Sequence, residues 1–154
     1  MPHPCPSDAE IASILRDTRT IALVGASPQP ARPSFAVMRF LVARGYRVLP
    51  VNPGLAGGTI QGLPVFASLA DLPEPVDMVD VFRNSEAAGS VVDEALALAP
   101  RPRVIWMQVG VSNPAAAARA EAAGLRVVMD RCPKIEYRRL AGEIGGAADR
   151  QGES

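Results

Sequence analysis

Histidine and cysteine are almost absent from this sequence, which limits the chemistry that it can support. The only histidine is His3, and the two cysteines, Cys5 and Cys132, lie near opposite ends of the chain. Such a spacing suits neither a zinc site nor a disulfide framework, so the expected compartment is a reducing cytoplasm. His3 falls in a proline-rich start, and no acid–base pair is evident. We therefore predict no catalytic residue and no metal ligand.

Long apolar runs and an excess of one charge are also missing. No run approaches the ~18 apolar residues of a membrane helix, and the start MPHPCPSDAE has no feature of a secretion signal. The 16 Lys and Arg residues balance the 16 Asp and Glu residues, so the chain has no overall positive field for nucleic acid. We expect neither a membrane nor a nucleic acid as a partner, and any anion site must be local.

Short apolar runs are what the sequence does contain. Nearly continuous hydrophobicity is typical of strands buried on both faces, as in a parallel sheet covered by helices. Five segments have this character: 20–25, 47–52, 77–82, 103–110 and 126–130. Capping residues and helical periodicity predict helices at 7–17, 34–45, 84–99 and 113–124. The Gly- and Pro-rich segment 53–75 is expected to hold only a short strand or a single helical turn.

The order of these elements predicts an α/β fold. Alternating strands and helices give a Rossmann-like, doubly wound sheet of about five parallel strands with helices on both faces. At 154 residues the chain suits one domain, which would bury roughly 70% of its unfolded-chain surface. We expect this domain to span 7–140, with a flexible N-terminal tail at 1–6 and a flexible C-terminal tail at 141–154.

The loops that follow the strands should meet at one edge of the sheet, where ligands of such folds bind. These loops are 25–34, 52–53, 82–85, 107–111 and 130–134. The first, GASPQPARPS, keeps only Gly25 of the G-x-G-x-x-G dinucleotide fingerprint. Its prolines hold an extended shape, Arg32 adds a guanidinium, and the helix that opens at Ser34 adds a positive N-terminus. This loop is expected to hold phosphates, and the alternative is a rigid connector with a surface arginine.

The end of the second strand argues against an ordinary NAD enzyme. Such enzymes place an Asp or Glu there to hold the ribose hydroxyls, whereas this chain has Asn52 followed by Pro53. An NADP-type site stays open.

Five stretches together resemble one family: GASPQPARPS, GYRVLPVNP, PEPVDMVDVFRNSE, VIWMQVGV and AAARAEAAGLRVVMDRCPKIEY. Over residues 10–140 the sequence resembles the small single-domain coenzyme A-binding proteins. These are related to the N-terminal domain of the succinyl-CoA synthetase α subunit. The resemblance implies that coenzyme A is the ligand, with its 3′-phospho-ADP end over the strand ends.

The resemblance also implies which residues contact the ligand: Gly25, Ala26, Ser27, Arg32, Pro33, Ser34, Asn52, Pro53, Phe82, Arg83, Met107, Gln108 and Val109. Those of the first loop would hold phosphates, and the Asn-Pro pair would border the adenosine. Phe82 and Arg83 would close one side of the site. Met107, Gln108 and Val109 would lie by the nucleotide and pantetheine. Relatives often carry a basic residue soon after Asn-Pro. Here no charge follows until Asp71, which leaves Arg32 and Arg83 as the principal charge partners.

Catalysis is not part of what the resemblance implies. The synthetases pass phosphate through a histidine in a separate domain and need an ATP-grasp partner, and this chain matches neither. The expected function is the binding of coenzyme A or an acyl-coenzyme A without a reaction. Two alternatives stay open: an NADP- or other nucleotide-dependent enzyme, and a regulatory or scaffold protein that senses acyl-coenzyme A through a protein partner.

Three single residues carry separate hypotheses. Cys132 lies beside Arg131, so its thiol could exchange with the ligand's thiol, and the alternative is a half-buried small residue before a proline-fixed turn. Asp80, inside an apolar run, is expected to accept backbone or arginine hydrogen bonds near the strand end, with a catalytic acid as the alternative. Trp106 is expected in the sheet core, with base stacking as the alternative.

Overall fold

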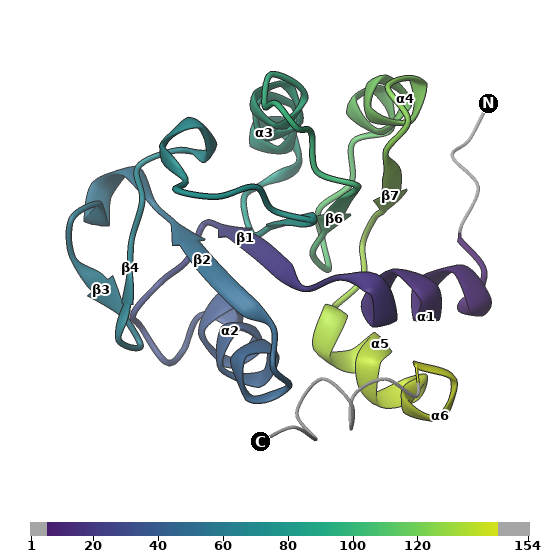
Figure 1. Ribbon diagram of the computed structural model, residues 1–154, viewed down its shortest axis with the longest axis horizontal. Coiled ribbons are helices and arrows are strands. Elements are labelled where there is room, and N and C mark those ends of the chain that lie inside the picture. The colour runs from purple at the N-terminus through teal and green to yellow at the C-terminus, as the bar shows by residue number, and fades with distance from the viewer. Residues whose placement is uncertain (1–5, 145–154) are drawn as a thin grey trace.

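A sheet of five parallel strands organises the chain (Figure 1), in a computed structural model that describes residues 6–144. The strands are β1 (Thr20–Val24), β2 (Arg47–Val51), β5 (Met78–Val81), β6 (Val104–Met107) and β7 (Arg126–Val128). Their order in the sheet is β2-β1-β5-β6-β7, and every neighbouring pair is parallel. Each strand lies inside one of the five apolar runs, so the predicted sheet is confirmed.

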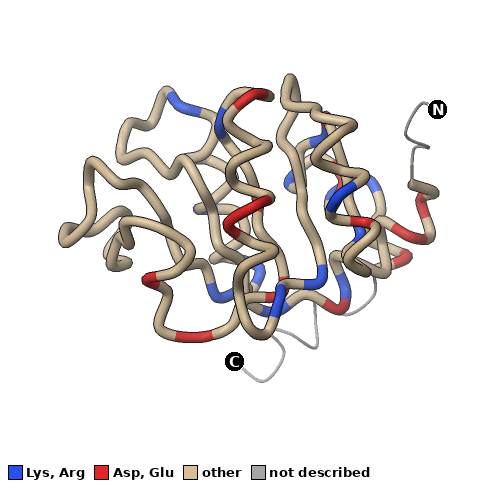
Figure 2. The backbone as a smooth tube through the Cα atoms, turned by 90° about the horizontal axis from the view of Figure 1, so that it is seen from above, with Lys and Arg blue, Asp and Glu red and all other residues tan. Residues whose placement is uncertain are grey.

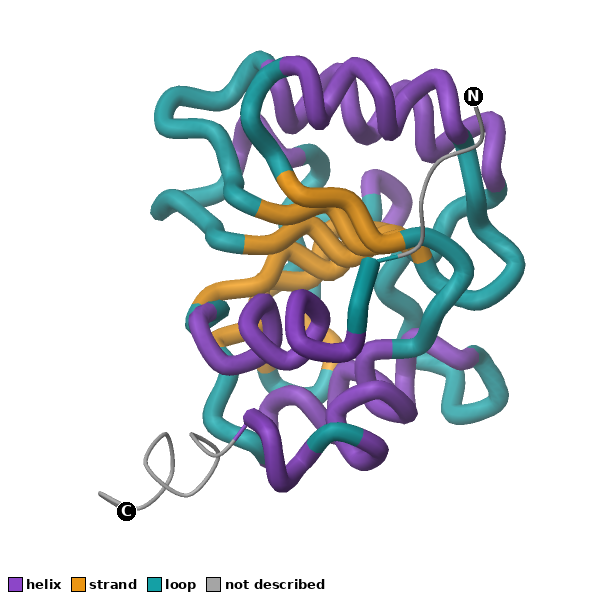
Figure 3. Tube along the Cα trace, turned by 90° about the vertical axis from the view of Figure 1, so that its right-hand side faces the viewer, coloured by secondary structure: helices purple, strands orange, loops and turns teal. Residues whose placement is uncertain are grey.

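Helices cover both faces of this sheet, as Figure 3 shows. One face carries α1 (Asp8–Asp17), α2 (Pro33–Ala43), α5 (Pro133–Arg139) and α6 (Ala141–Ile144), and the other carries α3 (Ser85–Leu96) and α4 (Pro114–Ala122). The Rossmann-like, doubly wound class is therefore confirmed, and the strand order reverses between β1 and β5. Within residues 6–144, no helix has the length and hydrophobicity that crossing a membrane requires.

Alternation along the strands separates two buried layers. In β1, Ile21 and Leu23 face the layer of α1, α2 and α5, whereas Ala22 and Val24 face the layer of α3 and α4. Trp106 is fully buried in the first layer, and its ring N–H donates to the carbonyl oxygen of Arg131 at 2.8 Å. Its expected place in the sheet core is confirmed.

Side-chain caps fix where three of the helices begin. Ser7, Asn84 and Asn113 each accept a hydrogen bond from the backbone N–H three residues further on, at 3.1, 2.8 and 3.0 Å. These bonds satisfy N–H groups that the first turn of a helix leaves without an intrahelical partner. The three helices start where their capping residues predict.

The segment between β2 and β5 holds slightly more structure than its composition predicts. It contains an antiparallel pair, β3 (Thr59–Ile60) and β4 (Leu63–Pro64), between two 3₁₀ turns, η1 (Pro53–Leu55) and η2 (Leu69–Asp71). Phe66 joins the segment to the end of β2, because its N–H donates to the Pro50 oxygen and its own oxygen accepts from the Asn52 N–H. In Figure 1 this segment lies at the left, beside the carboxyl end of β2.

The C-terminal part of the described chain differs from the prediction. The sequence predicts a turn at Pro133, but α5 begins there. Proline is also a favoured first residue of a helix. α6 occupies the start of the expected tail at 141–154, and Ile144 is only 1% exposed because it packs into the same core cluster as α1. The expected tail thus overlaps a helix at 141–144. Residues 145–154, and residues 1–5 with His3 and Cys5, lie outside the described residues.

Candidate functional site

A cavity of about 730 Å³ lies at the carboxyl edge of the sheet, where the chain leaves β1, β2, β5 and β6. Every candidate residue from the sequence lines it except Met107. Five further residues complete the lining: Pro28, Gln29, Gly54, Leu55 and Val111. Pro28, Gln29 and Val111 sit in loops expected to converge here, so extending the candidates to whole loops would have found these three. Gly54 and Leu55 follow the expected loop 52–53 and lie in η1.

Met107 is the candidate that the structure removes from the cavity. It is fully buried and packs in the layer of α3 and α4. The reason is the alternation of β6: Trp106 faces one layer, Met107 faces the other, and Gln108 is the first residue past the strand. Only the residues that follow the strand can turn toward the edge.

Gly25 starts the first loop in a conformation that favours glycine, with φ at +91°. A Cβ atom there would lie 2.9 Å from the backbone oxygen of Phe82, which is closer than real Cβ contacts. The N–H groups of Gly25 and Ala26 both donate to the Val51 oxygen, at 3.0 and 3.3 Å. The loop is thus held between the ends of β2 and β5 from its first residue.

Asn52 fixes the same loop from the other side. Its side-chain N–H donates to the Ala26 oxygen at 2.9 Å, and its side-chain oxygen accepts from the Gly54 N–H at 2.9 Å. An Asp at this position could not make the first of these bonds, because a carboxylate accepts only. The amide that replaces the ribose-binding acid of NAD enzymes therefore holds the protein's own loop, while its side chain still borders the cavity.

The middle of the first loop presents donors to the cavity. The Ser27 hydroxyl oxygen accepts from the Gln29 N–H at 3.1 Å, which leaves its own O–H to donate elsewhere. Arg32 is the N-cap of α2 and Pro33 its first residue, and both line the cavity with Ser34. The positive end of the α2 dipole and the Arg32 guanidinium are thus presented to one space, which suits an anion.

Arg83 brings the second charge to the cavity, from the loop after β5. Among residues 6–144, no side chain or carbonyl group forms a hydrogen bond or ion pair with the guanidinium of Arg32 or Arg83. Both side chains are exposed. Two unengaged guanidinium groups, from loops on adjacent strands, can therefore reach a phosphate-bearing ligand.

Gln108 forms part of the far side of the cavity and is only 8% exposed. Its backbone is held twice: its N–H donates to the Val81 oxygen at 3.1 Å, and its carbonyl oxygen accepts from the Val111 N–H at 2.8 Å. Its side-chain oxygen is buried and has no hydrogen-bond partner within the described part of the chain. Sequence reasoning named this residue but gave no sign of that unsatisfied acceptor.

The loop after β7, which the topology brings to the same edge, does not line the cavity. Arg131 of this loop joins a network with α5 instead: the Glu136 carboxylate binds Arg131 at 3.1 Å and Arg139 at 2.7 Å. Arg139 also pairs with Asp8 at 2.8 Å, and this hydrogen-bonded guanidinium lowers the pKa of the Asp8 carboxyl. These ion pairs fasten α5 to α1 and to the segment that follows β7.

Cys132 belongs to this structural segment. It directly precedes α5, is 8% exposed and packs in the layer of α1 and α2. Since the thiol lies outside the cavity lining, the interpretation as a small buried residue before a proline fits it better than disulfide exchange with a ligand.

Asp80 is wholly buried in the middle of β5, level with Leu23 on one side and Trp106 on the other. Neither of its carboxyl oxygens has a hydrogen-bond partner within residues 6–144, so the expectation of backbone or arginine donors is wrong. Its neighbours in the sheet are an aliphatic and an aromatic side chain whose ring N–H is already engaged. Burial raises the pKa of the Asp80 carboxyl well above its usual value, which favours the neutral acid.

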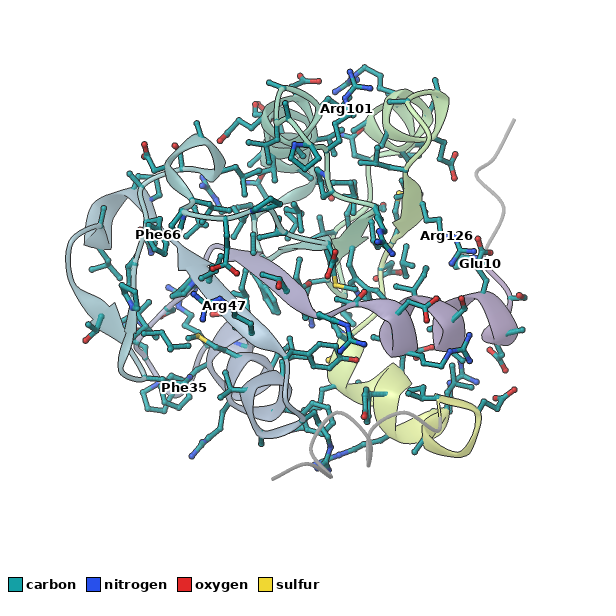
Figure 4. The ribbon with its side chains drawn as sticks, viewed as in Figure 1. Glu10, Phe35, Arg47, Phe66, Arg101 and Arg126 are labelled. Atoms are coloured by element: carbon teal, nitrogen blue, oxygen red, sulfur yellow. The ribbon has the colours of Figure 1, made fainter. Side chains whose placement is uncertain are left out.

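A second cavity, of about 470 Å³, lies at the opposite, amino edge of the sheet. Arg101 and Arg126, both labelled in Figure 4, line it with Arg103, Asp17 and Asp77. The Asp77 carboxylate accepts the backbone N–H groups of Arg19 and Thr20, so it has a structural role. Ligands of this class of fold bind at the other edge, and the candidate site is the carboxyl-edge cavity.

The fold and the cavity together define a Rossmann-like α/β protein with a ligand-sized space at the point where the strand order reverses. The model of the CoA binding domain family matches residues 19–138. The chain belongs to this family, and the resemblance seen in its sequence is confirmed.

Three known proteins illustrate the range of this similarity. The chain is 38% identical to the uncharacterized protein YneT of Bacillus subtilis over 133 residues, which cover 86% of this chain and 95% of YneT. It is 43% identical to cell-free ID.343 from Thermus thermophilus, whose solved structure superposes with a TM-score of 0.82 over 88% of this chain and 99% of that one. A shorter match, 29% identical over 86 residues, links it to the alpha subunit of an ADP-forming acetate–CoA ligase from Pyrococcus furiosus. That match covers 52% of this chain and 18% of the ligase subunit.

Proposed function

We propose that this protein binds coenzyme A or an acyl-coenzyme A in the carboxyl-edge cavity and catalyses no reaction of its own. The observation that carries the proposal is the convergence of four loops on one cavity, in a chain of the CoA binding domain family. Its volume of about 730 Å³ is within the ordinary range of small-molecule sites. The ligase subunit from Pyrococcus furiosus, which is similar to part of this chain, carries coenzyme A in its name. That name supports coenzyme A as the ligand proposed for this protein.

The charges of the cavity support a phosphate-bearing ligand. Arg32, the N-terminus of α2 and the Ser27 hydroxyl lie on the β1 loop, and Arg83 lies on the neighbouring β5 loop. We assign the diphosphate to this region, with the adenosine on the side of Asn52 and Pro53. The pantetheine arm then runs toward Gln108 and Val109.

The absence of acid–base groups supports a binding protein over an NADP-dependent enzyme. Among the described residues that line the cavity, the arginines are the only titratable side chains. General acid–base chemistry requires a group whose pKa can be brought near the working pH, and arginine does not offer one.

A partner-dependent sensor of acyl-coenzyme A is the second candidate, and one observation favours it. Val109 and Leu55 line the cavity yet are 57% and 39% exposed. Exposed apolar side chains beside a ligand site suit an acyl group or a protein partner that reads the bound ligand. The partner and the cytoplasmic location stay predictions.

Isothermal titration of the purified chain with coenzyme A, acetyl-CoA, NADP and ATP tests the proposal. We expect binding heats for the two coenzyme A ligands and weaker or no heats for NADP and ATP. Equal heats for all four ligands, or none for any of them, would overturn it. Selective binding of NADP would instead favour the enzyme interpretation.

A further inference from the structure

Gln108 lines the cavity, and its buried side-chain oxygen has no hydrogen-bond partner within residues 6–144. Leaving a buried acceptor without a donor costs on the order of 1–3 kcal/mol. The backbone of Gln108 is held by Val81 and Val111, so the residue cannot leave its place without breaking two hydrogen bonds. A bound ligand that supplies an N–H or O–H donor would remove this cost.

The chemistry of the acceptor restricts which ligand group it can meet. Ionised phosphate oxygens only accept hydrogen bonds, so they cannot pair with a carbonyl oxygen. In coenzyme A the N–H and O–H donors are the adenine amine, the hydroxyl groups, and the two amide N–H groups of the pantetheine arm, and the thiol is only a weak donor.

The strand order selects among these donors. Gln108 follows β6, which lies two strands from β1, or roughly 10 Å along the sheet edge. Asn52 follows β2, which lies on the other side of β1. With the diphosphate at the β1 loop and the adenosine toward Asn52, the arm is the part of the ligand that reaches β6. Its first amide stands a few bonds beyond the diphosphate. Val109 and Val111 flank Gln108 in the lining and offer apolar surface for the methyl and methylene groups of the arm.

We propose that the side-chain oxygen of Gln108 accepts a hydrogen bond from an amide N–H of the pantetheine arm. Gln108 thereby selects ligands that carry this arm over nucleotides that lack it. The inference rests on the proposed function and deepens it, because it assigns the specificity for the arm to one residue.

The test combines a protein variant with altered ligands. Gln108→Met keeps the length of the side chain and removes the acceptor, and Gln61→Met is the matched control outside the cavity. Each protein is titrated with coenzyme A, with analogues in which each arm amide is replaced in turn by an ester, and with adenosine 3′,5′-bisphosphate. We expect one ester replacement to weaken binding to the unaltered protein about tenfold and to have no further effect on Gln108→Met. Affinity for the bisphosphate should be the same in all three proteins.

The outcomes separate this inference from the proposed function. If the unaltered protein fails to bind coenzyme A, both are wrong. If it binds coenzyme A but tolerates both ester replacements, or if an ester weakens Gln108→Met as much as the unaltered protein, only the role of Gln108 is wrong. An equal loss of bisphosphate binding in Gln108→Met would place Gln108 on the nucleotide and also overturn the inference. Should Gln108→Met fail to fold, tolerance of both ester replacements by the unaltered protein still overturns the inference.

Discussion

Gly25 is a residue of the cavity lining at which a larger side chain meets two obstacles. It combines a φ of +91° with a predicted Cβ contact of 2.9 Å to the Phe82 oxygen. Gly57 has nearly the same φ, +92°, but nothing within 4 Å of its Cβ position. We expect Gly57→Ala to cost about 1 kcal/mol of stability from backbone strain alone. Gly25→Ala should cost about 2 kcal/mol more, because two backbone segments must also move apart.

Urea unfolding of the two alanine variants and the unaltered chain measures this difference. Coenzyme A affinity should fall in Gly25→Ala and stay unchanged in Gly57→Ala. Equal losses of stability in the two variants would show that the contact with Phe82 does not dictate the glycine.

Substitutions at Asn52 and Asn84 distinguish a position that needs the N–H group of a side-chain amide from one that needs only a hydrogen-bond acceptor. Asn52 uses its N–H toward Ala26, whereas Asn84 is a helix cap that only accepts, from Ala87. Asn52→Asp should therefore lose about 1–3 kcal/mol of stability, since a carboxylate would face a carbonyl oxygen. Asn84→Asp should be neutral or slightly stabilising, because a negative charge suits a helix N-terminus. Denaturant unfolding near pH 7 compares them, and similar effects at both positions would contradict the role assigned to Asn52.

At the scale of elements, β5 carries a carboxyl group where a strand of this sheet should be apolar throughout. The pKa of Asp80 is raised in the folded state by burial, from a usual value of 3.8. Its contribution to stability is therefore fully present below that value and is lost as pH rises toward the folded-state pKa. Within this window the loss is about 1.4 kcal/mol per pH unit.

Asp80→Asn removes this titration while keeping the shape of the side chain. The stability of the unaltered protein, relative to the variant, should fall as pH rises from about 4 toward neutrality. Unfolding curves at several pH values measure both proteins. Parallel pH profiles would show that Asp80 does not change its protonation on unfolding.

The elements also show what the sequence could and could not predict. The five strands were predictable because each is a continuous apolar run, and helices with side-chain caps were predictable from Ser7, Asn84 and Asn113. α5 was not predicted because a helix of seven residues is too short to show a clear periodicity. Glu136 also suggests an exposed position in the sequence, whereas in the structure it is buried between Arg131 and Arg139.

The sequence was sufficient to predict which loops meet at the carboxyl edge of the sheet, but not the direction of individual side chains. Met107 lies in the core, whereas its neighbour Gln108 lines the cavity. This difference depends on the residue at which β6 ends. Across the described part of the chain, the side-chain oxygen of Gln108 and both carboxyl oxygens of Asp80 lack hydrogen-bond partners. These are properties of packing, and no sequence pattern records them.

At the scale of the whole molecule, opposite charges are interspersed (Figure 2) and sum to zero, so attraction for an anionic ligand must be local. Arg32 lines the cavity, whereas Arg39 is exposed on α2 and stacks on the Phe35 ring at 5.2 Å. Arg32→Gln should weaken coenzyme A binding at least tenfold at low salt, and Arg39→Gln, with the same change in net charge, should not.

Titrations at two salt concentrations complete this comparison. The difference between the unaltered protein and Arg32→Gln should shrink as salt rises, because screening weakens a charge at an open site. An equal effect of the two substitutions would mean that net charge, and not the position of Arg32, governs binding.

The anchoring of the first loop has a consequence for the rates of binding. Hydrogen bonds from Gly25 and Ala26 to Val51, and from Asn52 to Ala26, tie the start of the loop to the end of β2 through contacts within the protein. An incoming molecule meets a formed surface and need not wait for a slow rearrangement of this loop. Related ligands should therefore associate at similar rates, and their affinities should differ mainly in how long each one stays bound.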